Sequence, residues 1–188
     1  MENALLRAGG WQLTMGDSLH GKALGVLGLG NIGSEVARIG LAFGMEVIAW
    51  SQNLTPDKAQ ASGARLVSKE ELFRSADILT IHLVLSQRTR GLVGAVELQA
   101  MKPSARLINT SRGPIVDEPA LIEVLRERRI AGAALDVFDI EPLPTDHPFR
   151  SLENVLATPH TGYVARDLYK TFYRDTVKNI ERWLAQET

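Results

Sequence analysis

The chain has 188 residues, 45% hydrophobic and 23% charged, a composition typical of a globular protein rather than a disordered or fibrous one. Its 21 Lys and Arg residues nearly balance its 22 Asp and Glu residues, so the net charge of −1 gives no reason to expect nucleic acid or an anionic membrane as a partner. It has no cysteine, no apolar run of the roughly 20 residues that span a bilayer and no secretory signal, and we therefore expect a soluble cytoplasmic protein without disulfides.

Apolar and amphipathic segments alternate along the chain, and turns rich in glycine, proline and polar residues separate them. In chain order, the sequence predicts a weak helix over 1–7, a polar turn over 16–21, a strand over 23–27, a helix that stops at Gly44, a strand over 45–50, a short helix from 55, a helix over 68–76, a strand over 78–85, a helix over 94–101, a strand over 106–109, a helix over 117–129, strands over 131–137 and 155–158, and a helix over 166–185.

The spacing of apolar residues predicts which side chains are buried. The strand over 78–85 is interrupted only by Thr80 and His82, as expected of a strand that is covered on both faces. Two helices are expected to bury a face of residues that recur every three or four positions. These faces are Ile32, Val36, Ile39 and Phe43 in the first helix, and Tyr169, Tyr173, Val177, Ile180 and Leu184 in the second. The alternation predicts an α/β fold of the Rossmann type, a doubly wound parallel sheet with helices on both faces, in a single domain over 1–188.

A glycine pattern, Gly28-Leu29-Gly30-Asn31-Ile32-Gly33, lies between the first predicted strand and the next helix. Such spacings also occur in ordinary turns, but here strand, glycines, helix and second strand fall within about 30 residues, as in dinucleotide-binding units. Gly28 would permit the tight turn, Gly30 the close approach of a pyrophosphate, and Gly33 the packing of helix on strand. The helix N-terminus would present unpaired N–H groups to the phosphates, so a dinucleotide cofactor is expected.

The sequence leaves open whether this cofactor is NAD or NADP. About 20 residues after the glycines, where an Asp or Glu usually binds the adenosine ribose, the chain has Ser51. Serine would not repel the 2′-phosphate of NADP, but it offers no positive charge to attract it. Gln52 and Asn53 can pair with phosphate or hydroxyl groups equally well, and the nearest base is Lys58, beyond Pro56.

Three polar stretches follow later predicted strands, at 109–114, 136–142 and 158–162. In open α/β sheets, ligands bind at the carboxyl edge where such stretches meet. They supply an arginine that can grip a carboxylate with two hydrogen bonds, several carboxylates, and a histidine that can move a proton near neutral pH. The set suits a substrate that is both an acid and a carbonyl compound.

With these motifs in this order, the chain resembles the nucleotide-binding domain of the D-isomer-specific 2-hydroxyacid dehydrogenases. The resemblance runs from Gly9-Gly10-Trp11 to the last helix and includes 28–33, 109–118, 135–142 and 158–162. It implies an oxidoreductase that transfers a hydride between NAD or NADP and a 2-hydroxy or 2-keto acid. In the family, dinucleotide domains pair about a two-fold axis, partly through the segment before the first strand. The resemblance therefore also implies a homodimer, in which 1–14 packs against a second subunit.

The resemblance implies roles for individual residues. Arg112 would hold the substrate's carboxylate and carbonyl, His160 would be the acid/base group, and Glu141 would pair with His160. Asp136 would contact the nicotinamide amide. The other implied cofactor contacts are Gly28, Gly30, Asn31, Ile32, Gly33, Ser51, Val84, Thr110, Ser111 and Gly162, together with Arg112 and His160. No metal ligands are expected. The remaining histidines, expected to be structural or solvent-facing, are His20, His82 and His147.

The resemblance covers only one of the family's two domains, so we expect the second, which contacts the substrate carboxylate and closes the cleft over it, to be absent from this sequence. A half-built cleft cannot exclude water or fix a substrate, so we expect the chain by itself to bind cofactor and to turn over 2-keto acids poorly or not at all. Two other classes stay open. One is a non-catalytic NAD(H)-binding or dimerisation module, like the corepressors that share these motifs, and the other is a different Rossmann-domain enzyme, such as a hydrolase with tightly bound cofactor.

Overall fold

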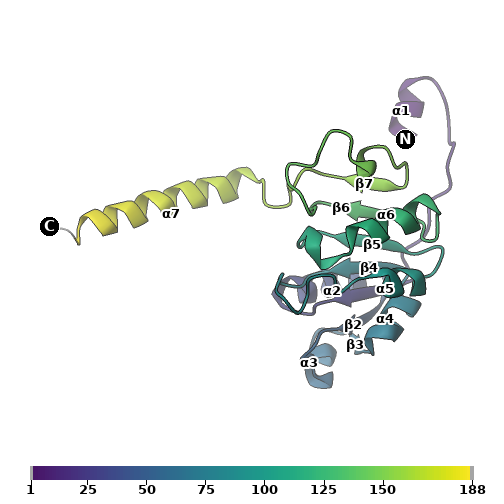
Figure 1. Cartoon of the computed structure of the whole chain (residues 1–188), viewed down its shortest axis with the longest axis horizontal. Helices are drawn as coiled ribbons and strands as arrows, with labels where there is room; N and C mark the ends of the chain where they lie inside the picture. Colours follow the sequence, from purple (N-terminus) through teal and green to yellow (C-terminus); the bar gives the residue numbers. More distant parts are fainter. Residues whose placement is uncertain (1, 187–188) are drawn as a thin grey trace.

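The computed structural model describes residues 2–186. A parallel sheet of seven strands lies at its centre, in the order β3-β2-β1-β4-β5-β6-β7 (Figure 1). The strands are β1 (Ala23–Leu27), β2 (Glu46–Trp50), β3 (Arg65–Leu66), β4 (Ile78–Ile81), β5 (Arg106–Asn109), β6 (Gly132–Leu135) and β7 (Val155–Ala157). The order reverses at β1, which pairs with β2 on one side and with β4 on the other. The predicted doubly wound parallel sheet is confirmed.

Helices pack on both faces of this sheet. The helices are α1 (Glu2–Arg7), α2 (Asn31–Ala42), α3 (Pro56–Ala61), α4 (Lys69–Ser75), α5 (Ala95–Ala100), α6 (Glu118–Arg126) and α7 (Arg166–Leu184), with 3₁₀ turns η1 (Gly113–Ile115) and η2 (Pro148–Arg150). α2 packs against β1 and β2 on one face, whereas α4, α5 and α6 form a row on the other. The helices that connect successive strands, α2 to α6, thus return the chain to the same edge of the sheet for the next strand.

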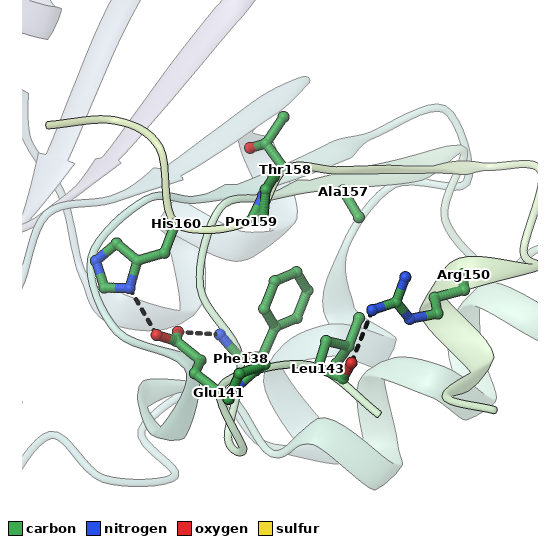
Figure 2. Close-up of a pocket in the computed structure, with 9 residues that line it drawn as sticks. Phe138, Glu141, Leu143, Arg150, Ala157, Thr158, Pro159 and His160 are labelled. Atoms are coloured by element: carbon green, nitrogen blue, oxygen red, sulfur yellow. Dashed lines mark hydrogen bonds and ion pairs between the residues drawn. The ribbon is translucent and has the colours of Figure 1, made fainter. Parts of the chain in front are cut away.

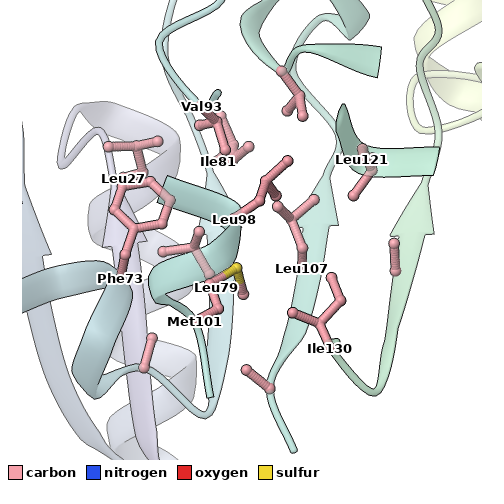
Figure 3. Close-up of a cluster of buried hydrophobic side chains, with 14 of the residues drawn as sticks. Leu27, Phe73, Leu79, Ile81, Val93, Leu98, Met101, Leu107, Leu121 and Ile130 are labelled. Carbon is pink, nitrogen blue, oxygen red and sulfur yellow. The ribbon is translucent and has the colours of Figure 1, made fainter. Parts of the chain in front are cut away.

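The larger hydrophobic core lies between the sheet and the row of α4, α5 and α6 (Figure 3). Phe73 and Leu98 enter it from the helices, and Leu27, Leu79 and Leu107 enter it from three adjacent strands, all almost fully buried. Burying a side chain of this size contributes about 1.5–3 kcal/mol. The core therefore fixes the central strands, and their carboxyl ends carry the polar stretches identified in the sequence.

The buried face of α2 differs from the predicted one. The residues it buries are Gly33, Ala37 and Gly40, and a Cβ on Gly40 would lie 2.5 Å from the Leu24 side chain of β1. The helix therefore lies too close to β1 for larger side chains on that face. Of the predicted apolar face, Val36 packs partly against the core, and the remaining side chains are exposed: Ile32, Ile39 and Phe43. The helical period was right, and the choice of face was wrong.

The long C-terminal helix α7 extends away from the sheet (Figure 1) and has no buried residue. All five side chains that were predicted to be buried are exposed: Tyr169, Tyr173, Val177, Ile180 and Leu184. The first turn of α7 touches the preceding loop, where the Tyr169 ring stacks on Tyr163 with 6.4 Å between centroids. The prediction of burial was wrong, because the surface that would cover this apolar face is not part of residues 2–165.

Smaller differences concern the sheet itself. The strand predicted over 78–85 ends at Ile81, because the His82 N–H makes a last bond to the Leu27 carbonyl (2.8 Å) and the chain then leaves the sheet. β3, only two residues long, was not predicted. On the face that carries α2, β5 to β7 border a groove of about 460 Å³ over Ile108, Ala134 and Leu156. Within residues 2–186, no helix combines the length and the apolar character needed to cross a membrane.

Candidate active site

The glycine turn joins β1 to α2, and at one of its three glycines there is free space beside the backbone. Gly28 has φ of +104°, which favours glycine, and its N–H donates to the Trp50 carbonyl (2.9 Å). A Cβ on Gly33 would collide with the Gly28 carbonyl oxygen, so the turn and the helix are in close contact. A Cβ on Gly30, by contrast, would meet nothing within 4 Å. Gly28 and Gly33 are thus required by the fold, whereas Gly30 leaves space at the N-terminus of α2.

This helix N-terminus suits an anion. Gly30 is the N-cap, so the first backbone N–H groups of α2, those of Asn31, Ile32 and Gly33, have no partner within the helix. The helix dipole adds a partial positive charge there, and the first turn has no acidic residue. Ile32 is 69% exposed beside this end. The turn therefore offers the N–H donors and the empty space that a dinucleotide pyrophosphate needs.

Ser51 follows β2 and contacts the glycine turn directly. Its hydroxyl oxygen accepts a hydrogen bond from the Leu29 N–H (3.1 Å). The hydroxyl hydrogen stays available to donate to another group. Ser51 therefore shapes the glycine turn in addition to lying where an adenosine ribose is expected, and it places no negative charge there.

The loop after β5 is shaped by Asn109, whose side chain is almost fully buried. Its Oδ1 accepts from the Ser111 N–H (3.0 Å) and its Nδ2 donates to the Arg112 carbonyl (3.0 Å). The Ser111 hydroxyl donates to the Ile81 carbonyl of β4 (2.9 Å), and the exposed Arg112 guanidinium donates to the Ser111 carbonyl (2.6 Å). Asn109 was part of the sequence motif but was assigned no role. The structure identifies it as the residue that holds the Arg112 loop.

The central feature of the site is a hydrogen-bonded contact between the side chains of Glu141 and His160 (Figure 2). His160 Nδ1 lies 2.6 Å from Glu141 Oε2, and Glu141 Oε1 accepts from the Phe138 N–H (2.9 Å). His160 has φ of +52°, an uncommon conformation for a residue other than glycine, and the Tyr163 ring meets its ring edge to face at 5.6 Å. Such strained positions concentrate at functional sites.

Glu141 is held in its ionised form. Burial by itself raises the pKa of the Glu141 carboxyl, but the hydrogen bonds from His160 and the Phe138 N–H, and the charges of His160 and Arg112, lower it below its ordinary value. The charge of Arg112 acts on the Glu141 carboxyl, so Arg112 lies within electrostatic range of Glu141. Arg112 also precedes Gly113, which packs against the Phe138–Asp139 peptide, so the three residues that were predicted to act on a substrate lie in one region of the structure.

Asp136 ties the His160 loop to the end of β6. Its Oδ1 accepts from Thr158 Oγ1 (2.5 Å) and the Thr161 N–H (2.8 Å), and its Oδ2 accepts from the Gly162 N–H (2.8 Å). Burial alone would raise the pKa of Asp136, but these hydrogen bonds outweigh it and lower the pKa below the ordinary value. The carboxylate fixes the backbone on both sides of His160. Its predicted contact with a nicotinamide stays a prediction.

The other predicted cofactor residues lie at the same edge of the sheet, because all the strands are parallel. Val84 is 83% exposed after β4, and Thr110 is exposed after β5. A cavity of about 590 Å³ opens beside Glu141 and His160, between the segments 138–143 and 157–160 (Figure 2). Within residues 2–186, no group of three or more potential metal ligands lies together.

The three remaining histidines lie outside this arrangement, as expected. His20 is exposed. His82 contacts Thr80 Oγ1 through Nε2 (2.9 Å), and burial lowers the pKa of His82. His147 pairs with Glu118.

Fold and site define a dinucleotide-binding domain whose edge carries an arginine, a glutamate and a histidine. The sequence profile of the D-isomer specific 2-hydroxyacid dehydrogenase NAD-binding domain matches residues 1–162, and the chain belongs to this family. It is thus an NAD-binding domain of the kind found in NAD-dependent dehydrogenases such as glyoxylate reductase and phosphoglycerate dehydrogenase.

Individual relatives agree with this assignment. The chain is 48% identical over 160 residues to a glyoxylate reductase of Aeropyrum pernix, in a match that covers 84% of this chain and 48% of the relative. It is 39% identical over 185 residues to a D-3-phosphoglycerate dehydrogenase of Methanocaldococcus jannaschii, covering 95% of this chain and 35% of that one. A crystal structure of a phosphoglycerate oxidoreductase from Vibrio cholerae o395 superposes with a TM-score of 0.91 and 37% identity over 98% of this chain and 61% of that chain. The chain thus spans between a third and two thirds of these three proteins.

Proposed function

We propose that this chain is the cofactor-binding part of an oxidoreductase that transfers a hydride between NAD or NADP and a 2-hydroxy or 2-keto acid. The observation that carries the proposal is the 2.6 Å contact between His160 and Glu141, close to Arg112 and on the sheet edge that carries the glycine turn. A turn without a ligand would explain the glycines alone. It would not explain an acid/base pair and a fixed cation at the same edge.

In this proposal the phosphates lie at the N-terminus of α2, next to Gly30. The other cofactor contacts are Gly28, Asn31, Ile32, Gly33, Ser51, Val84, Thr110, Ser111, Arg112, Asp136, His160 and Gly162. When bound, the nicotinamide supplies or accepts the hydride. The residues of this chain must then bind the acid and move the proton.

His160 is arranged for proton transfer. Glu141 accepts the bond at Nδ1, so the other ring nitrogen, Nε2, points away from it (Figure 2) and is the atom that would give a proton to the carbonyl oxygen of a keto acid. Glu141 is ionised and stabilises the imidazolium form that this step requires. Arg112 carries a permanent charge and would bind the substrate carboxylate and polarise the carbonyl.

We also propose that a second domain completes the site. Relatives are longer than this chain, and α7 carries an exposed apolar face that extends away from the sheet. Packing of a substrate-binding domain against α7 would bury that face and close the cleft near His160. The chain alone is then expected to reduce glyoxylate or hydroxypyruvate more slowly than about 1 per second, the lower end of typical enzyme rates.

We further propose a cytoplasmic homodimer. The lack of cysteine fits a reducing compartment. The segment before β1 exposes Leu6, Trp11, Leu13 and Met15, and the groove over β5 to β7 is a surface of suitable apolar character to receive it from a second copy. A light-scattering mass of about twice 20.6 kDa at micromolar concentration is expected, and a mass of 20.6 kDa would count against the dimer.

A fluorescence titration of the chain with NADH and NADPH in one buffer tests the cofactor proposal. Ser51 carries no charge that would select for or against a 2′-phosphate, so both cofactors are expected to bind, with dissociation constants within tenfold, about 1.4 kcal/mol. Stronger discrimination in either direction would mean that other groups select the cofactor. Binding of neither would overturn the proposal.

A further inference from the structure

A second carboxylate–imidazole pair joins the two ends of the segment that carries Glu141. Glu118, the first residue of α6, lies with its Oε1 3.0 Å from Nε2 of His147, which precedes η2. The His147 and Glu118 side chains are only 14% and 18% exposed, whereas those of His160 and Glu141 are 34% and 35% exposed. The Glu118–His147 pair, here called the inner pair, is therefore better shielded from water than the Glu141–His160 pair, the outer pair.

The inner pair connects the two ends of one loop. The Asp139 N–H, at the start of the loop, donates to Glu118 Oε2 (3.4 Å), and His147, at its end, bonds to Glu118 Oε1. His147 Nδ1 accepts a bond from the Phe149 N–H (3.3 Å) and is therefore the unprotonated nitrogen. The proton is then on Nε2, and His147 donates it to the acceptor-only carboxylate of Glu118. One side chain of α6 thus closes the segment 139–147 into a loop.

Glu141 lies within this loop and depends on its shape. Its Oε1 bonds to the Phe138 N–H, directly before the loop, and its Oε2 reaches out to His160. The Phe138–Asp139 peptide is also wedged against η1, since a Cβ on Gly113 would come within 2.5 Å of the Asp139 nitrogen. Rotation of this peptide would turn the Asp139 N–H away from Glu118 and would shift the backbone that leads from Phe138 to Glu141. The contact between Glu141 and His160 therefore needs both ends of the loop in place.

We propose that Glu118 and His147 are positioning residues, which close the loop 139–147 and thereby hold Glu141 against His160. The inference deepens the proposed function and rests on it only for the role of the outer pair in proton transfer. It predicts that loss of the inner pair releases Glu141 while the sheet and its helices stay folded.

The test measures the tautomer of the His160 ring in the chain without cofactor or substrate. Because Glu141 only accepts hydrogen bonds, the neutral His160 ring must carry its proton on Nδ1, and the ¹⁵N shifts of the two ring nitrogens report this at pH 8. The signal is assigned by its loss in His160→Asn. Glu118→Ala and His147→Ala are each expected to lose the Nδ1-protonated signature. Glu123→Ala, which removes an exposed carboxylate from the same helix, is expected to keep it.

Circular dichroism establishes that each variant is folded. A folded Glu118→Ala or His147→Ala protein that keeps the wild-type signature would overturn the proposal. Unfolding of both variants would overturn it as well, since the pair would then serve the fold and not the position of Glu141. The measurement needs no bound cofactor, so its result is separate from a failure of the proposed dehydrogenase function.

Discussion

Gly30→Asp should weaken cofactor binding without weakening the fold. Gly30 is the N-cap of α2, with φ −91° and ψ −159°, and a Cβ there meets nothing within 4 Å. Asp is among the best N-cap residues and improves on Gly by a few tenths of a kcal/mol, to which its charge at the helix N-terminus adds about 0.3–1 kcal/mol. The free energy of unfolding is therefore expected to stay level or rise.

The effect on binding has the opposite sign, because the carboxylate would occupy the place of the pyrophosphate. Two unit charges about 4 Å apart repel by about 1 kcal/mol even with the screening of bulk water, and by about 4 kcal/mol with the screening typical of a protein surface. Two phosphate charges thus cost at least about 2 kcal/mol, and the dissociation constant for NADH should rise by at least about thirtyfold.

Gly16→Asp is the matched control for this substitution. Gly16 also has nothing within 4 Å of an added Cβ and no positive φ, and it lies in the exposed segment before β1. The two variants carry the same net charge and are compared by urea unfolding and by NADH fluorescence titration. Equal NADH affinity of the two would refute the assignment of the phosphate site to the N-terminus of α2.

Three further outcomes are expected. Asp136→Asn turns an NH₂ group toward backbone donors and should lower the free energy of unfolding, measured in urea at neutral pH, by about 1–3 kcal/mol. Because the pKa of Asp136 is lowered in the folded protein, the stability difference between wild type and variant should reach its full size at pH values above the ordinary pKa of 3.8, and it should vanish as the pH falls through the pKa of the folded state. Burial lowers the pKa of His82, so as the pH falls the imidazole is protonated in the unfolded chain before it is protonated in the folded one. The wild type should therefore lose stability relative to His82→Gln below pH 6.5, and free energies of unfolding that change with pH in parallel for the two proteins would count against this. Truncation after Ala165 removes α7, which buries nothing, and should leave the free energy of unfolding within about 0.5 kcal/mol, whereas a larger loss would show that α7 packs on the sheet.

The sequence was informative where function depends on backbone shape. Gly28 and Gly33 permit a turn and a close approach that other residues could not adopt, and the prolines beside Glu141 and His160 restrict the backbone, so these residues predict turns at the sheet edge. Parallel strands then bring these turns together, whatever their separation in sequence. For this reason the stretches 109–114, 136–142 and 158–162 could be grouped from the sequence, whereas the choice of Arg112, Glu141 and His160 within them rested on the family resemblance.

The sequence was less informative where packing decides between equivalent patterns. α2 has an apolar face and a face of small residues at the same period, and only the close approach to β1 selects Gly33, Ala37 and Gly40. In α7 the apolar stripe is present but has no covering surface within residues 2–165. The bond between Glu118 and His147 joins residues 29 positions apart, and no spacing rule predicts it.

The most direct test of the central claim is hydride transfer in a complete enzyme. The matching segment of the Aeropyrum pernix glyoxylate reductase, 48% identical over 160 residues, can be replaced by this chain, and glyoxylate reduction followed by the loss of NADH or NADPH absorbance. His160→Asn in this chimera is expected to lower kcat by about 10²–10⁴-fold, the usual contribution of a general acid. His20→Asn, at an exposed histidine outside the site, should leave kcat unchanged. A folded chimera that reduces glyoxylate equally fast with either substitution would contradict the account.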